Sequence, residues 1–174
     1  KSGTNVLDWT IPDEWNIKDA YIIGPDGKKF AEFKKHNLHI VGYSVPVNKT
    51  ISLKELKKHL HTLKNQPEAI PYVTSYYKRT WGFCIKYNEY KKLKKGSYRV
   101  YINSKIEPGY LVYSDKLIKG KSKKEILLST YLCHPQMANN ELSGPLVWSS
   151  LYKILKNTGP HEYSYRFLIC PENI

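Results

Sequence analysis

Two almost continuous apolar runs, at residues 125–132 and 163–170, constrain the fold of this chain more than any other feature of its sequence. Apolar runs of this length are typical of strands that are covered on both faces, as in a parallel sheet. Between them lies an apolar-rich segment, residues 145–156, with Pro145 near its start and Gly159-Pro160 just past its end, which predicts a helix. The order strand, helix, strand predicts a βαβ unit with a right-handed crossover.

A single βαβ unit is not a finished sheet, so we expect the 174 residues to open a domain whose remainder lies beyond residue 174. The predicted fold class is therefore α/β, with an incomplete parallel sheet and an inserted, mainly β domain. We expect residues 1–21 and 110–174 to form the partial α/β domain and residues 22–109 to form the insertion.

The inserted segment combines short β-like runs with one helix signal. Ser52-Leu53-Lys54-Glu55 has the pattern of a capping box and predicts an amphipathic helix with Leu53, Leu56, Leu60 and Leu63 on one face. Runs rich in Tyr, Val and Ile predict strands at residues 38–45, 72–77, 82–85 and 98–102. Short strands at this spacing favour a small barrel or sandwich.

The chain is strongly basic, with a net charge of +13 that comes from 25 lysines and only three arginines. Most of the excess charge lies between Lys86 and Lys124. An excess of basic residues could indicate an anionic partner, but arginine recognises phosphates and bases better than lysine does. Lysines spread over strands and turns favour a solvated surface, and we therefore expect no nucleic-acid partner.

Cys84, Cys133 and Cys170 show no CxxC spacing and no disulfide framework, which favours a reducing cytoplasm. Cys133 and Cys170 each end an apolar run, where a cysteine usually behaves as a small buried hydrophobic residue. No apolar run approaches the roughly 20 residues of a membrane span, so we expect no membrane partner.

Polar side chains follow both predicted parallel strands. Residues 133–144 contain His134, Gln136, Asn139, Asn140 and Glu141, and Glu172 follows the second strand. Ligands of open parallel sheets bind at the carboxyl ends of the strands, so an imidazole and carboxylates would meet there, which suits zinc. A further glutamate could accept a proton from water. The alternative is a loop histidine bonded to backbone, with Asn, Ser and Gly serving as turn and cap residues.

Several segments resemble one family of proteins. They are residues 129–135 (STYLCHP), 137–145 (MANNELSGP) and 167–174, together with residues 8–12, 14–17, 71–77 and 81–84. The sequence resembles the co-catalytic zinc aminopeptidase superfamily, and within it a bacterial and archaeal family of aminopeptidase-like proteins. Those proteins carry a small β domain inserted into the peptidase fold and a winged-helix domain at the C-terminus.

The resemblance implies roles for individual residues. His134 matches a zinc-ligating histidine at the end of a central strand, and Asn140 stands where the superfamily has an aspartate that bridges two zinc ions. Glu172 matches the glutamate region that supplies a general base. Ser143-Gly144 match the small residues that open the following helix.

The sequence also departs from the superfamily pattern. The aspartate that usually follows the histidine by two residues is Gln136 here, the bridging aspartate is Asn140, and Asn173 replaces the second residue of a doubled glutamate. Glu141 could supply the missing carboxylate. A site with one metal ion, a weaker site and a different hydrolytic role all stay open.

These observations predict a zinc-dependent aminopeptidase-like hydrolase that acts on a peptide or a related small amide, with one or two zinc ions and Glu172 as the proton carrier. We expect little or no turnover from residues 1–174 alone, because further ligands and strands are missing. The alternative is a fold that has lost catalysis and binds an anionic polymer, a carbohydrate or a nucleic acid, through its basic β domain. Gln136 and Asn140 favour this alternative, whereas His134 and Glu172 favour the enzyme.

Overall fold

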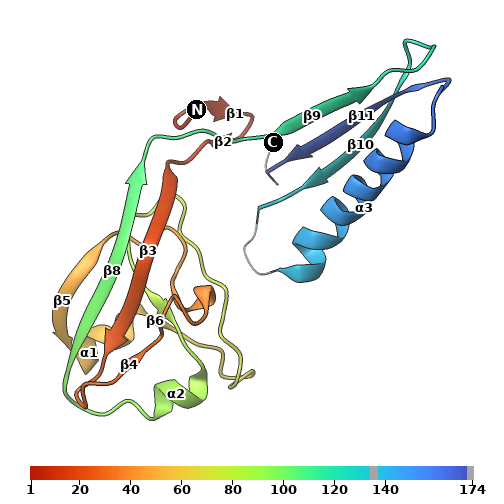
Figure 1. Cartoon of the computed structure of the whole chain (residues 1–174). Helices are drawn as coiled ribbons and strands as arrows, with labels where there is room; N and C mark the ends of the chain where they lie inside the picture. Colours follow the sequence, from red (N-terminus) through yellow and green to blue (C-terminus); the bar gives the residue numbers. More distant parts are fainter. Residues whose placement is uncertain (134–136, 172–174) are drawn as a thin grey trace. The chain divides into compact units, whose positions relative to one another are not determined.

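The computed structural model describes residues 1–133 and 137–171, and within this range the chain divides into two compact units (Figure 1). Residues 1–4 and 10–109 form the first, which we call the β unit. Residues 5–9 and those from 110 on form the second, which we call the α/β unit. None of the helices in the described range combines the length and the apolar character that a membrane crossing requires.

The β unit contains most of the strands and all of the short helices. Its elements are β3 (Glu14–Ile23), β4 (Lys29–Phe30), η1 (Asn37–His39), β5 (Val47–Ser52), α1 (Leu53–Leu56), η2 (Lys57–His59), β6 (Leu60–His61), β7 (Phe83–Cys84), α2 (Tyr87–Lys91) and β8 (Ser97–Glu107). Two strands of two residues each, β1 (Asn5–Val6) and β2 (Trp9–Thr10), come before them in the sequence and pair with each other.

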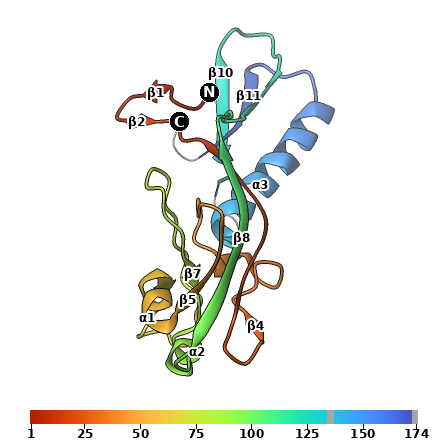
Figure 2. The ribbon, with the colours of Figure 1, turned by 90° about the vertical axis from the view of Figure 1, so that its left-hand side faces the viewer.

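An antiparallel sheet with the strand order β4-β3-β8-β5 is the frame of the β unit (Figures 1 and 2). Alternate residues of its longest strand, β8, point into the core, where Tyr98, Val100 and Ile102 are buried. Leu56 from α1 and Phe83 from β7 are also fully buried in this core. The unit therefore closes around one apolar cluster, as a period of two in the strands requires.

The predicted helix at residue 53 begins as expected but ends early. The hydroxyl of Ser52 accepts a hydrogen bond from the N–H of Glu55 at 3.3 Å, which is the expected cap. After Leu56 the chain tightens into η2 and then enters β6, where Leu60 pairs with Phe83. Pairing with a distant strand therefore replaces the helix that the leucine spacing predicted.

Two of the predicted strands, at residues 38–45 and 72–77, are not regular strands. The N–H of Val41 donates to the carbonyl oxygen of Gly82 at 3.1 Å, while the N–H of the next residue, Gly42, donates to Val73 at 2.9 Å. The chain thus forms single bridges with two different partners and builds no ladder with either. A Cβ atom at Gly42 would press against the side chain of Thr74, so this crossing needs a glycine.

The α/β unit confirms the predicted strand, helix, strand order. It contains β9 (Ser114–Ile118), β10 (Glu125–Tyr131), α3 (Ala138–Asn157) and β11 (Ser164–Cys170). β10 and β11 are parallel, and α3 lies along one face of the pair (Figures 1 and 2). Phe167 of β11 is fully buried, and the rings of Trp148 and Tyr152 from α3 each meet it edge-on at 5.2 Å. The predicted α/β fold class, with one βαβ unit and a separate, mainly β segment, is confirmed.

Two features of this unit differ from the sequence-based expectation. An additional strand, β9, pairs antiparallel with β11, so the sheet has the order β10-β11-β9. The helix also begins at Ala138 and not near Pro145, which lies inside it. Pro145 is the eighth residue of this helix, past the first turn where prolines are usually found, so its position marked the wrong boundary.

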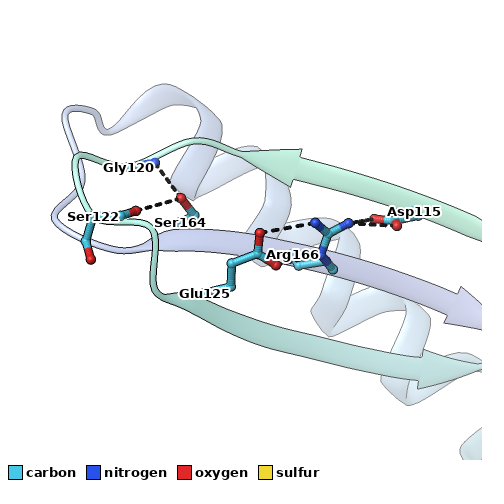
Figure 3. Close-up of polar contacts among 6 residues, drawn as sticks. All are labelled: Asp115, Gly120, Ser122, Glu125, Ser164 and Arg166. Atoms are coloured by element: carbon cyan, nitrogen blue, oxygen red, sulfur yellow. Dashed lines mark hydrogen bonds and ion pairs between the residues drawn. The ribbon is translucent and has the colours of Figure 1, made fainter.

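Arg166 joins all three strands of this sheet (Figure 3). Its guanidinium donates to Glu125 of β10 at 2.7 and 3.1 Å and to Asp115 of β9 at 2.8 and 3.0 Å. At the same end of β11, the hydroxyl of Ser164 accepts from the N–H of Gly120 and donates to the carbonyl oxygen of Ser122. These contacts hold the sheet at the end where β10 and β11 begin.

Candidate active site

β10 and β11 end side by side, and their ends define the candidate site. Tyr131 is the register partner of Cys170, and the N–H of Leu132 donates to the carbonyl oxygen of Cys170 at 3.0 Å. Because the two strands are parallel, the chain leaves both of them at the same edge of the sheet. The segments that follow them in sequence, which start at Cys133 and Pro171, therefore begin from neighbouring positions.

His134, Gln136 and Glu172 lie outside the described residues. The structure describes Cys133 and Pro171, the residues immediately before His134 and Glu172. The expected approach of the imidazole of His134 and the carboxylate of Glu172 therefore stays a prediction, made at a described sheet edge.

The start of α3 is fixed against β10 by a glycine. A Cβ atom at Gly144 would collide with the hydroxyl oxygen of Thr130, so the helix and the strand can approach this closely only without a side chain there. As a result, the first turns of α3 lie beside the end of β10. Asn140 and Glu141, which the sequence placed in a loop, belong to the first turn of this helix.

Asn140 is exposed, and its side chain is oriented by Tyr131. The amide nitrogen of Asn140 donates to the Tyr131 hydroxyl at 3.0 Å. This bond occupies the nitrogen and leaves the amide oxygen, the atom that would ligate a metal, unused by Tyr131. Nothing in the sequence pattern pointed to Tyr131 as a partner of this residue.

Glu141 is buried, with only 4% of its surface exposed. One carboxylate oxygen accepts from the N–H of Cys133 at 2.5 Å, and the other lies 3.7 Å from the Cys133 sulfur, which donates to it. The backbone N–H of Glu141 donates to Met137 at 2.8 Å, as one of the first hydrogen bonds of the helix. A carboxylate in the first helical turn is also favoured by the helix dipole.

Of the expected metal ligands, the structure describes Asn140 and Glu141, and these two differ in how well they suit a zinc ion. Asn140 offers an amide oxygen of a kind that can ligate a metal, whereas both oxygens of Glu141 face Cys133. Within residues 1–133 and 137–171, no three His, Cys, Asp or Glu side chains are grouped closely enough to hold a metal ion. A complete zinc site would therefore need His134 and Glu172, whose imidazole and carboxylate groups are of the right chemical kind.

The histidines of the β unit have structural contacts. The Nδ1 atom of His39 lies 2.8 Å from the carbonyl oxygen of Cys84. The ring of His59 stacks on Trp81 at 3.7 Å, and its Nδ1 atom lies 3.0 Å from the Trp81 carbonyl oxygen. Burial lowers the pKa of His61, and the neighbouring His59 lowers it further. His39 and His59 therefore have structural partners within the β unit.

The family described as "Domain of unknown function (DUF2172)" matches residues 14–105, which is about half of the chain. A protein of Clostridium acetobutylicum is 49% identical over all 174 residues, and its name proposes a role in polysaccharide biosynthesis and describes an aminopeptidase-like domain. The chain spans 40% of the length of that relative.

A solved structure shows the same fold. It is a crystal structure of a Clostridium acetobutylicum protein whose name proposes a peptidase, with 49% sequence identity and a TM-score of 0.91. The match covers 98% of this chain and 40% of the solved one. At this level of identity and overlap, the two units described above have close counterparts in that protein.

Proposed function

The chain belongs to the DUF2172 family, and we propose that the complete protein is a zinc-dependent, aminopeptidase-like hydrolase of peptides or related small amides. The names of the two relatives, one aminopeptidase-like and one peptidase, support the kind of reaction. The observation that carries the proposal is the in-register parallel pairing of β10 and β11 up to Tyr131 and Cys170. Both strands therefore end at one sheet edge, and His134 and Glu172 follow these ends in the sequence.

In this proposal, His134 and the amide oxygen of Asn140 hold one or two zinc ions together with ligands from the rest of the protein. Zinc would supply a Lewis acid that polarises the amide carbonyl and makes water a better nucleophile at neutral pH. An asparagine offsets less metal charge than the aspartate of the superfamily. We therefore expect the site to bind zinc more weakly than a site with two bridging carboxylate oxygens.

Glu172 is the proton carrier of the proposed reaction. Its carboxylate takes a proton from the attacking water and returns it to the leaving amine, so the protein ends the cycle unchanged. The free amine and the carboxylate of the cleaved amide are the products. Because the described α/β unit is one βαβ unit with an edge strand, and further ligands would come from the rest of the protein, we expect residues 1–174 alone to turn over little or no substrate.

We also propose a cytoplasmic location. Cys84, Cys133 and Cys170 form no disulfide with one another in the described part of the chain. Cysteines outside disulfides are the normal state in a reducing compartment, which supports the proposal.

Hydrolysis of short peptides by the complete protein tests this function. The wild type with added zinc should release N-terminal residues, and Glu172→Gln should lower the rate by roughly 10²–10⁴-fold, as expected when a general base is removed. Glu162→Gln, at an exposed glutamate in the β11 region, is the matched control and should leave the rate unchanged. An unchanged rate in Glu172→Gln would contradict the proposed role.

A second function, binding of an anionic polymer through the β unit, is favoured by its lysine-rich surface around α1, η2 and α2. The ammonium groups of Lys57 and Lys91 lie over the rings of Tyr90 and Tyr87, at 4.9 and 5.3 Å, and neither forms an ion pair with a carboxylate of the described residues. These positive charges therefore remain available to an anion. Retention on heparin that falls steeply with salt would support this function, and no retention at low salt would contradict it.

A further inference from the structure

We propose that Glu141 is a positioning residue, whose buried carboxylate holds the backbone at Cys133 and thereby the point from which the next residue, His134, extends. This inference rests on the proposed function of the site. It differs from the expectation in the sequence analysis that Glu141 could supply the missing metal-binding carboxylate.

The contacts of Glu141 carry the inference. Its carboxylate is 4% exposed and accepts the N–H of Cys133 at 2.5 Å, while its second oxygen lies 3.7 Å from the sulfur of the same residue. A hydrogen bond from a backbone N–H to a buried carboxylate is charge-assisted and stronger than a neutral one. Both oxygens are thus directed to one residue, the second residue after the end of β10.

Glu141 also connects two elements that are held independently. Its own backbone belongs to the first turn of α3, which the close contact between Gly144 and Thr130 fixes against β10. Cys133 continues from Leu132, which is hydrogen-bonded to Cys170 of β11. The carboxylate therefore joins a fixed helix start to a fixed strand end across eight residues of sequence. A rigid support of this kind is what a metal-binding imidazole requires from its surroundings.

Zinc binding by the complete protein tests the inference. We compare Glu141→Gln, Glu141→Ala and the exposed control Glu162→Gln by competition with a chelating dye. Glu141→Ala should weaken zinc binding about 10–100-fold without changing the number of ions bound, as is usual for groups that orient a ligand. Glu141→Gln should weaken it less, because its amide oxygen can still accept the N–H of Cys133. The control should match the wild type.

Amide hydrogen exchange provides a readout that needs no metal. In the zinc-free protein, the amide of Cys133 should exchange roughly tenfold faster or more in Glu141→Ala than in the wild type, because it loses its acceptor. Should Glu141→Ala fail to fold, Glu141→Gln should show an intermediate increase. Equal exchange in the wild type and in a folded Glu141 variant would overturn the inference.

The outcomes separate this inference from the proposed function. If Glu141→Gln loses a whole equivalent of zinc, as His134→Ala should, then Glu141 is a ligand and the positioning role is wrong. If the wild type binds no zinc, the proposed function fails. The exchange rate of the Cys133 amide then still decides whether Glu141 holds this backbone.

Discussion

The three cysteines lie in different surroundings, and this difference predicts their reactivity. Cys84 is fully buried in the β unit, and burial raises the pKa of its thiol to about 12. Cys133 is exposed, contrary to the small buried residue that its place after an apolar run suggested. Because the thiolate is the reactive form, the native protein should leave Cys84 unmodified by a thiol reagent at neutral pH, while Cys133 reacts.

Mass spectrometry of the labelled peptides measures this difference. Cys84 should become labelled only after unfolding in denaturant, which also serves as the control for its chemical competence. Labelling of Cys84 in the native protein at the rate of Cys133 would show that the core of the β unit is not closed.

At the scale of residues, local signals were predictable and contacts between distant segments were not. The cap formed by Ser52 and Glu55 depends on three residues of sequence, and the structure confirms it. The bond from Cys133 to Glu141 depends on how the intervening chain returns to the strand end. Spacing along the sequence carries no information about that path, so the burial of Glu141 could not be foreseen.

At the scale of elements, the contact between α3 and β10 predicts the effect of a substitution at Gly144. Gly144→Ala places a methyl group against the hydroxyl of Thr130 and should destabilise the α/β unit by roughly 1–3 kcal/mol, the usual cost of overpacking. At an uncrowded position within a helix, replacing glycine by alanine instead stabilises the folded protein by up to about 1 kcal/mol. The sign of the change in unfolding free energy therefore tests the contact.

A second substitution isolates the contact. Thr130→Ala removes the colliding oxygen, so the double variant should recover part of the stability that Gly144→Ala loses. Denaturant unfolding of the four proteins in this cycle gives the coupling energy. A stabilising effect of Gly144→Ala alone would mean that the helix does not approach the strand as described.

The ion pairs of Arg166 predict how the stability of the three-stranded sheet depends on pH. Hydrogen bonding from Arg166 holds the pKa of the Glu125 carboxyl below its ordinary value of 4.5, with the charge of the guanidinium as a further cause. A carboxyl group whose pKa is lower in the folded state than in the unfolded chain stabilises the protein at pH values above its pKa in the unfolded chain. This contribution is lost as the pH falls through the folded value.

Glu125→Gln should therefore lower the melting temperature at pH 7 by a modest amount, since the pair is exposed. The difference from the wild type should close as the pH falls below 4.5. Melting curves of both proteins across this range measure the effect, with Glu162→Gln as the exposed control. A difference that stays constant down to pH 3 would contradict the assignment.

The failures of element prediction have a common physical cause. The leucine spacing from Leu53 to Leu63 favoured one helix, yet pairing of Leu60 with Phe83 ends it after Leu56. The strand β9 was missed because its sequence, Ser-Asp-Lys-Leu-Ile, is mostly polar and exposed, as edge strands often are. In both places, partners far along the chain decided the local structure.

At the scale of the whole molecule, the long apolar elements were the predictable part. The apolar runs at β10 and β11 identified a parallel pair and the helix between them. The expected burial holds for Phe167 of β11 but not for β10 in the described part of the chain, where Leu127 is 58% exposed. The chain covers 40% of the length of each of the two relatives, so in those proteins the counterpart of this strand pair belongs to a longer chain. The candidate site follows from topology, whereas its individual contacts required the structure.

The zinc content of the complete protein tests the central claim most directly. After incubation with zinc and exhaustive dialysis, the wild type should retain at least one equivalent, and His134→Ala should retain none or markedly less. Glu162→Gln should match the wild type, because its side chain is exposed in the β11 region. If the wild type retained no zinc, or His134→Ala retained as much as the wild type, the proposed site at the ends of β10 and β11 would be wrong.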